Sequence, residues 1–226
     1  MVIDGRTDAC LDLLFFLFLF LIRFLQTCQG AGKTQTLLWL RKFFEEVCGW
    51  SHGQEFVFCA SQNTMTALIN GVTLHSFFGL VFMNKDGRKM NVQNEDKADM
   101  SHYYIRFQAL RFLFIDEFST AAIEWFAEIN HKTTTHIREN NTWSLRKEGE
   151  TISHRPFGGL NLVVSGDAWQ FGPVGAGAVF DDPFKTKFDS ASNKIISEMF
   201  WKKEEDSFNQ FLELTVERRC KDRWLS

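Results

Sequence analysis

The sequence lacks the cysteine spacing of a zinc-binding or disulfide-stapled protein. Its five cysteines are odd in number and widely separated, and no two of them form a C-x-x-C pair. Zinc modules and disulfide frameworks depend on such pairs or on an even set of cysteines. The pattern therefore disfavours both classes and fits a reducing intracellular compartment.

The sequence also lacks an excess of positive charge. Its formal net charge is −3 over 226 residues, so no general basic field surrounds the protein. Contact with nucleic acid would have to come from a local groove. Three histidines, His131, His136 and His154, lack the spacing of metal ligands. Hydrophobic content of 45% and charged content of 23% are those of a folded globular protein.

The N-terminal region holds an apolar run that is too short to span a bilayer. Residues 13–22 form an uninterrupted run of ten apolar residues, about half of what a transmembrane helix needs. A signal peptide is disfavoured, because the run leads directly into the strand that feeds the next motif. We treat residues 1–21 as an apolar lead-in and expect no stable membrane association. Three interpretations of this run stay open. In order of preference, they are a core strand with an unusual lead-in, a poorly bounded N-terminus and a membrane anchor.

The motif that follows is a glycine-containing turn that ends in Gly-Lys-Thr and opens a helix. Small residues let backbone N–H groups converge on phosphate oxygens, and the helix N-terminus adds its dipole. Lys33 would reach the β- and γ-phosphates, and the Thr34 hydroxyl would ligate Mg²⁺. Thr27 departs from the pattern, which has glycine there, because a β-branched residue suits a turn of positive φ poorly. The predicted nucleotide-binding residues are Cys28, Gln29, Gly30, Ala31, Gly32, Lys33 and Thr34.

Apolar strands and amphipathic helices alternate along the rest of the chain. Strands are predicted before the phosphate loop and over residues 55–60, 110–115, 161–165 and 211–214. Helices are predicted over residues 34–48, through 67–68 and around 123–129. Polar stretches at about 84–104 and 131–156 are predicted as surface excursions, the second including a solvated loop or a ragged helix end. The alternation indicates an α/β fold with a mostly parallel sheet, helices on both faces, and a site at the strand C-terminal ends.

Polar residues at three predicted strand ends are candidates for catalysis. Asp116 and Glu117 follow a buried strand, where the Asp can hold the Mg²⁺ shell and the Glu can polarise the attacking water. A helix N-cap is the alternative for this pair. Gln170 follows the next strand, where it could sense a bound phosphate or belong to a plain turn. Arg219 lies just past the last strand, where it could neutralise charge on the γ-phosphate or be a surface arginine.

Five segments in this order resemble the first motor domain of the PIF (petite integration frequency) helicases. These are ATP-driven superfamily-one DNA helicases that include helitron-associated forms. The segment P-F-G-G leading into G-D-x-x-Q is the most distinctive of the set. The matching segments are C-Q-G-A-G-K-T at 28–34, G-V-T-L-H-S-F-F-G at 71–79, L-F-I-D-E-F-S at 113–119, the stretch 156–174 and E-L-T-V-E-R-R at 213–219.

The resemblance implies a RecA-like P-loop NTPase domain over residues 22–226, with ATP and Mg²⁺ as ligands and single-stranded DNA or DNA junctions as partners. It implies that Lys33, Glu117, Gln170 and Arg219 act in hydrolysis and that Thr34 and Asp116 hold the metal. It implies roles in DNA repair, recombination and telomere maintenance, in the nucleus or mitochondrion of a eukaryote. The DNA track would run along Thr73, His75, Ser76, Phe77 and Pro173.

The chain departs from the family pattern in several places. Relatives have a Thr-Gly pair where Gln62 and Asn63 stand, and the upstream glutamine that reads adenine has no candidate. Phe171 and Gly172 differ from the residues that usually follow the sensor glutamine in the family. The resemblance does not extend to a second motor domain, so we expect a fragment of an ATP-dependent DNA helicase. The alternative is a catalytically inactive, truncated remnant of a helitron-type helicase that keeps the fold without turnover.

Overall fold

The computed structural model describes residues 22–27, 32–80, 103, 105–137, 156–167, 170–182, 192 and 210–214, with only the backbone for residues 22–27 and 210–213. The predicted lead-in at 1–21, most of the predicted excursions at about 84–104 and 131–156, residues 28–31 and Arg219 lie outside these ranges. None of the helices in the described ranges is long and apolar enough to cross a membrane.

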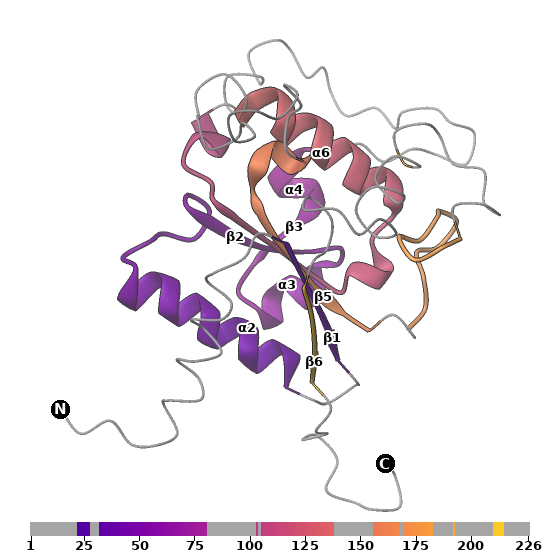
Figure 1. The fold of residues 1–226 in the computed structure, drawn as a ribbon, viewed down its shortest axis with the longest axis horizontal. Coiled ribbons are helices and arrows are strands. Elements are labelled where there is room, and N and C mark those ends of the chain that lie inside the picture. The colour runs from indigo at the N-terminus through magenta and orange to yellow at the C-terminus, as the bar shows by residue number, and fades with distance from the viewer. Residues whose placement is uncertain are drawn as a thin grey trace, which may run out of the picture.

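The described elements alternate between strands and helices (Figure 1). In chain order they are β1 (Ile22–Thr27), α2 (Lys33–Lys42), the π-helical turn η1 (Phe43–Val47), β2 (Phe56–Ala60), α3 (Asn63–Leu68), β3 (Val72–Thr73), α4 (Leu74–Phe78), β4 (Phe112–Asp116), the 3₁₀ turn η2 (Phe118–Thr120), α6 (Ile123–Ile137), the turn η4 (Pro156–Gly159), β5 (Asn161–Gly166) and β6 (Gln210–Leu214).

The strands form one parallel sheet in the order β3-β2-β4-β5-β1-β6. The prediction of a parallel α/β sheet is therefore confirmed. The sheet has one strand more than the sequence predicted, because the two-residue β3 is too short to give a periodic signal. Helix α6 continues to Ile137, so the first residues of the expected excursion at 131–156 are helical.

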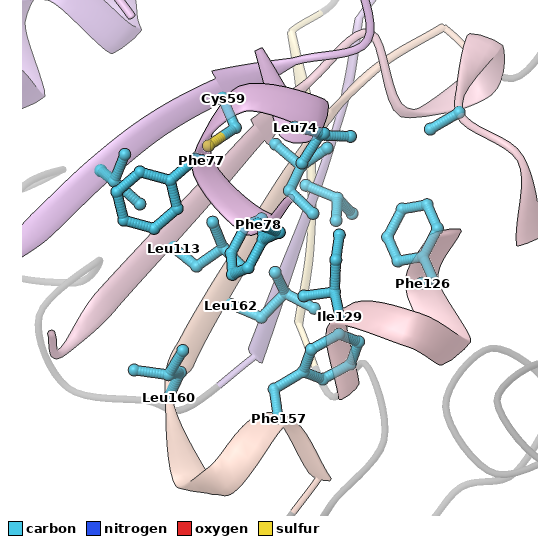
Figure 2. Packing of buried hydrophobic residues seen from close by; sticks show 14 of the residues in the cluster. Cys59, Leu74, Phe77, Phe78, Leu113, Phe126, Ile129, Phe157, Leu160 and Leu162 are labelled. Atoms are coloured by element: carbon cyan, nitrogen blue, oxygen red, sulfur yellow. The ribbon is translucent and has the colours of Figure 1, made fainter. Parts of the chain in front are cut away.

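Each face of the sheet buries alternate residues of the same strands, as the two-residue period of a strand requires. Phe58 and Phe114 face α2 and α3, where their rings stack at a centroid distance of 4.4 Å. Leu113 and Leu162 face the other way, into a larger cluster under α4 and α6 (Figure 2). Helices thus cover both faces, as predicted, and the two layers hold the strand ends in fixed positions.

Helix α2 differs at its end from the predicted helix over 34–48. Leu37, Leu40 and Phe44 are buried as expected. The last turn is π-helical, and its wider turn shifts the residues that follow relative to the apolar stripe. Val47 continues the helical spacing of these three apolar residues and would be buried in a regular α-helix, but it is 69% exposed.

The P-F-G-G motif is a packing element between α6 and β5. The Phe157 ring is fully buried in the larger cluster (Figure 2), and its backbone is left-handed at φ 53°. Its N–H donates to Oδ1 of Asn130 on α6 at 2.7 Å. The motif that is most distinctive for the resemblance therefore anchors the start of β5, from which the sensor segment continues.

We expect Asn130→Ala to lower the free energy of unfolding by about 1–3 kcal/mol, since the Phe157 N–H would then lose its acceptor in a buried place. Chemical denaturation measures this change. His131→Ala, an exposed position on the same helix, is the matched control. Equal stability of the two variants would show that the Asn130 bond does not hold the motif.

Candidate functional site

The site lies at the edge of the sheet where the parallel strands end. In the register of the sheet, Ala60 pairs with Asp116, and Asp116 pairs with Ser165. On the other side of β5, Gln26 pairs with Gly166 and Thr27 pairs with Leu214. The segments that leave β1, β4, β5 and β6 therefore start side by side, although they are far apart in the sequence.

Thr27 belongs to the strand and not to the turn. It is the last residue of β1 and pairs with Leu214 of β6. A β-branched residue suits an extended strand, so the departure from glycine does not strain the start of the loop in the way that the sequence suggested.

Helix α2 begins at Lys33, directly after the turn. Gly32 precedes the helix with φ 97°, a left-handed conformation that a residue with a side chain rarely adopts. Lys33 and Thr34 occupy the first turn, where the backbone N–H groups have no partners within the helix and the dipole favours an anion. This end of α2 has the properties of a phosphate-binding terminus.

The Lys33 ammonium lies between the two carboxylates that follow β4. Its Nζ is 3.5 Å from Oδ1 of Asp116 and also forms an ion pair with Oε1 of Glu117. The three side chains are 13%, 5% and 13% exposed, respectively. The structure thus brings together the lysine of the predicted phosphate loop and the predicted acidic pair, across the end of the intervening strand β5.

The backbone of Glu117 is held in an unusual conformation by its neighbours. Its φ is 52°, and its carbonyl accepts hydrogen bonds from the N–H and the hydroxyl of Thr120, at 3.0 and 2.9 Å. Because that hydroxyl has given its one hydrogen, the Thr120 Oγ1 accepts the contact from the Ser61 hydroxyl. Oε2 of Glu117 is buried and has no hydrogen-bond partner among the described residues. One oxygen of this carboxylate thus has no donor among the described residues.

A second polar group fixes the other carboxylate. Oγ of Ser165, at the end of β5, is 2.6 Å from Oδ1 of Asp116. Sequence reasoning did not single out Ser165, because a serine at the end of an apolar strand has no motif of its own. Only the pairing of β4 with β5 reveals the contact.

The glycine after Ser165 is required by a close approach. A Cβ at Gly166 would lie 2.6 Å from the Phe118 ring, in the turn that follows the acidic pair. Only a residue without a side chain allows β5 and this turn to meet so closely. Gln170 follows four residues later, in a turn where its N–H donates to the Asp167 carbonyl at 3.2 Å.

The residues expected along a DNA track fall into different environments. Thr73 caps α4, since its Oγ1 accepts the Ser76 N–H at 3.1 Å. The His75 ring packs edge to face on the Trp125 ring, with 4.3 Å between the ring centroids. Burial lowers the pKa of His75. Phe77 is 6% exposed and belongs to the core.

Phe77 is therefore a correction to the expected track. Its ring packs against Phe78 and Phe107 under α4, so it is not available to stack on a base. Ser76 is exposed and Pro173 is half-buried. On either side of Pro173, the side chains of Phe171 and Val174 are 94% and 102% exposed. Phe171 is thus an exposed aromatic residue close in sequence to Pro173, and sequence reasoning recorded it only as a departure.

Comparison with known proteins matches most of the chain. The family model described as PIF1-like helicase matches residues 21–219. The ATP-dependent DNA helicase Pif1 of Psychrobacter sp. (strain PRwf-1) is 28% identical over 158 residues, which are 68% of this chain and 20% of that protein. The chain thus spans about a fifth of the length of this curated relative.

Solved structures share the fold. Pif1 helicase from Candida albicans is similar with a TM-score of 0.59 at 20% identity, covering 96% of this chain and 40% of that one. Pif1 helicase from Bacteroides in complex with ADP-AlF3 and ssDNA gives a TM-score of 0.55 at 22% identity, covering 99% and 44%. This likeness confirms the expected RecA-like α/β fold, and each solved chain is more than twice as long.

Proposed function

The chain belongs to the PIF1-like helicase family, and on that premise we propose that it is the ATP-hydrolysing motor domain of a DNA helicase. The observation that carries the proposal is the position of the Lys33 Nζ, 3.5 Å from the Asp116 carboxylate and paired with Glu117. These three groups meet at the start of a helix and at the C-terminal edge of a parallel sheet, where such folds bind nucleotides.

The side chains present fit a magnesium–triphosphate group. The Asp116 carboxylate and the Thr34 hydroxyl are hard oxygen ligands of the kind that Mg²⁺ prefers. The Lys33 ammonium and the N-terminus of α2 supply the positive charge that phosphates need. Mg²⁺ bound there would neutralise charge that develops on the phosphates during transfer.

Glu117 is the proposed general base. Its buried Oε2 has no hydrogen-bond partner among the described residues, so it is free to accept a proton from a water that attacks the γ-phosphate. Its other oxygen pairs with Lys33. A bound triphosphate would compete for the lysine and release this carboxylate, which links nucleotide binding to activation of the base. The family resemblance assigns the γ-phosphate contacts to Gln170 and Arg219.

Single-stranded DNA is the proposed polymer substrate. The solved Bacteroides relative was obtained with ADP-AlF3 and ssDNA. In this chain the exposed Phe171 ring lies one residue after Gln170, so a base stacked on it would lie close to the proposed phosphate sensor. Aromatic stacking is tolerant of sequence, as a translocating motor requires.

We expect Phe171→Ala to weaken binding of an oligo-dT strand about 10-fold at low salt, since one stacked base contributes about 1–3 kcal/mol. Fluorescence anisotropy with a labelled strand measures the affinity. Trp39→Ala removes another exposed aromatic, on α2, and is expected to leave the affinity unchanged. If both variants bind like the wild type, DNA does not stack on Phe171.

Titration of the chain with ATP, with and without Mg²⁺, tests the proposed function directly. Calorimetry should give saturable binding that Mg²⁺ strengthens, and phosphate release should rise when single-stranded DNA is added. Translocation needs two motor domains that open and close around ATP, so unwinding is proposed only for a protein that contains both domains. A chain that binds no nucleotide under either condition would refute the proposal.

A further inference from the structure

Ser165 forms the shortest side-chain contact that fixes the Asp116 carboxylate among the described residues. Its Oγ is 2.6 Å from Oδ1, and the two residues are 1% and 4% exposed. They lie directly opposite each other in the parallel pairing of β4 with β5. Backbone hydrogen bonds of the sheet therefore set the distance between the two side chains.

The direction of this hydrogen bond follows from the chemistry of its partners. An ionised carboxylate only accepts, so the Ser165 hydroxyl donates to Oδ1. The same oxygen is 3.5 Å from the Lys33 Nζ. A hydrogen bond and an ion pair on the same oxygen restrict rotation of the carboxylate about the Cβ–Cγ bond of Asp116 and leave its other oxygen pointing in a fixed direction.

We propose that Ser165 is a positioning residue that orients the Asp116 carboxylate for the metal of a bound magnesium–nucleotide. The inference rests on the proposed function, because it assigns a task to Ser165 within that site. Groups that hydrogen-bond to a metal ligand orient it and raise its affinity for the metal. Ser165 also begins the segment that leads through Gly166 to Gln170, so the same strand end positions the metal ligand and the proposed sensor.

A merely structural serine would give a different result. If the bond only satisfied a buried polar group, its loss would lower the stability of the fold without changing the requirement for Mg²⁺. If the bond orients the carboxylate, its loss raises the Mg²⁺ concentration needed for nucleotide binding. Binding of nucleotide in the absence of metal stays unchanged, because Ser165 is assigned to the metal ligand and not to the phosphates.

The test uses Ser165→Ala in the full chain, with ADP and a fluorescent nucleotide titrated at increasing Mg²⁺ and in EDTA. We expect the half-saturating Mg²⁺ concentration to rise about 10-fold or more, with unchanged binding in EDTA. Ser119→Ala is the matched control, because Ser119 is also fully buried and its Oγ has no hydrogen-bond partner among the described residues. Ser165→Thr, which keeps the hydroxyl, should restore the wild-type requirement.

The outcomes separate the two proposals. Equal Mg²⁺ requirements for Ser165→Ala, Ser119→Ala and the wild type overturn the role of Ser165 and leave the proposed function standing. A wild-type chain without metal-dependent nucleotide binding overturns both. If Ser165→Ala does not fold, Ser165→Cys serves instead, because a thiol is a weak donor of nearly the same size, and it should also raise the Mg²⁺ requirement.

Discussion

Replacing Lys33 by alanine is expected to lower the affinity of the chain for Mg-ATP by at least about 100-fold. Charge-assisted hydrogen bonds contribute roughly 1.5–3 kcal/mol each, and the ammonium would serve more than one phosphate oxygen. A loss of about 2.7 kcal/mol corresponds to two orders of magnitude in affinity. Isothermal titration calorimetry with ATP and Mg²⁺ measures the difference.

The control for this experiment is Lys42→Ala, which removes an exposed lysine from the other end of the same helix. We expect it to bind Mg-ATP like the wild type. Lys33→Ala leaves Asp116 and Glu117 without their shared counter-ion. The stability of both variants should therefore be measured by denaturant unfolding, so that a loss of structure is not mistaken for the loss of a phosphate contact. Equal titration curves for the wild type and a folded Lys33→Ala variant would rule out the phosphate role of this lysine.

Glu117→Gln should reduce ATP hydrolysis by about 100-fold or more while nucleotide binding persists. An amide cannot accept the proton of the attacking water, and general bases contribute about 10²–10⁴ in rate. Binding should be retained or tightened, because the substitution removes the negative charge that pairs with Lys33 and repels phosphates. Phosphate release under single-turnover conditions, measured beside a binding titration, separates the two effects.

Glu124→Gln is a suitable control, since Glu124 is exposed near the start of α6. It should hydrolyse ATP at the wild-type rate. If Glu117→Gln also retains that rate, Glu117 is not the base. If the wild-type chain binds Mg-ATP but releases no more phosphate than Glu117→Gln, the alternative is favoured, in which the chain is an inactive remnant that keeps the fold but does not hydrolyse ATP.

The framework of the fold and much of the site could be predicted from the sequence, because both depend on local patterns. Buried parallel strands read as short apolar runs, and polar residues at their ends mark the edge where sites form. The sequence therefore predicted that Lys33 and the acidic pair would face one site. It also marked the turn of the phosphate loop by its glycines, although Thr27 proved to belong to β1.

The features that could not be predicted depend on contacts between distant segments. The partnership of Ser165 with Asp116 exists only because β5 lies beside β4, and no sequence spacing encodes that neighbour. Likewise, Phe77 lies in a motif that the resemblance assigned to the DNA track but packs in the core, where tertiary packing decides its environment. The π-helical turn that exposes Val47 changes the helical period, which an amphipathic pattern takes as constant.

A crystal structure of the chain with ADP, aluminium fluoride and Mg²⁺ would show whether the six predicted side chains gather around one nucleotide. We expect a nucleotide at the start of α2, with Lys33 on its phosphates, Thr34 and Asp116 on the metal, and Gln170 and Arg219 beside the fluoride. A nucleotide bound elsewhere, or a metal held without Asp116, would contradict this expectation.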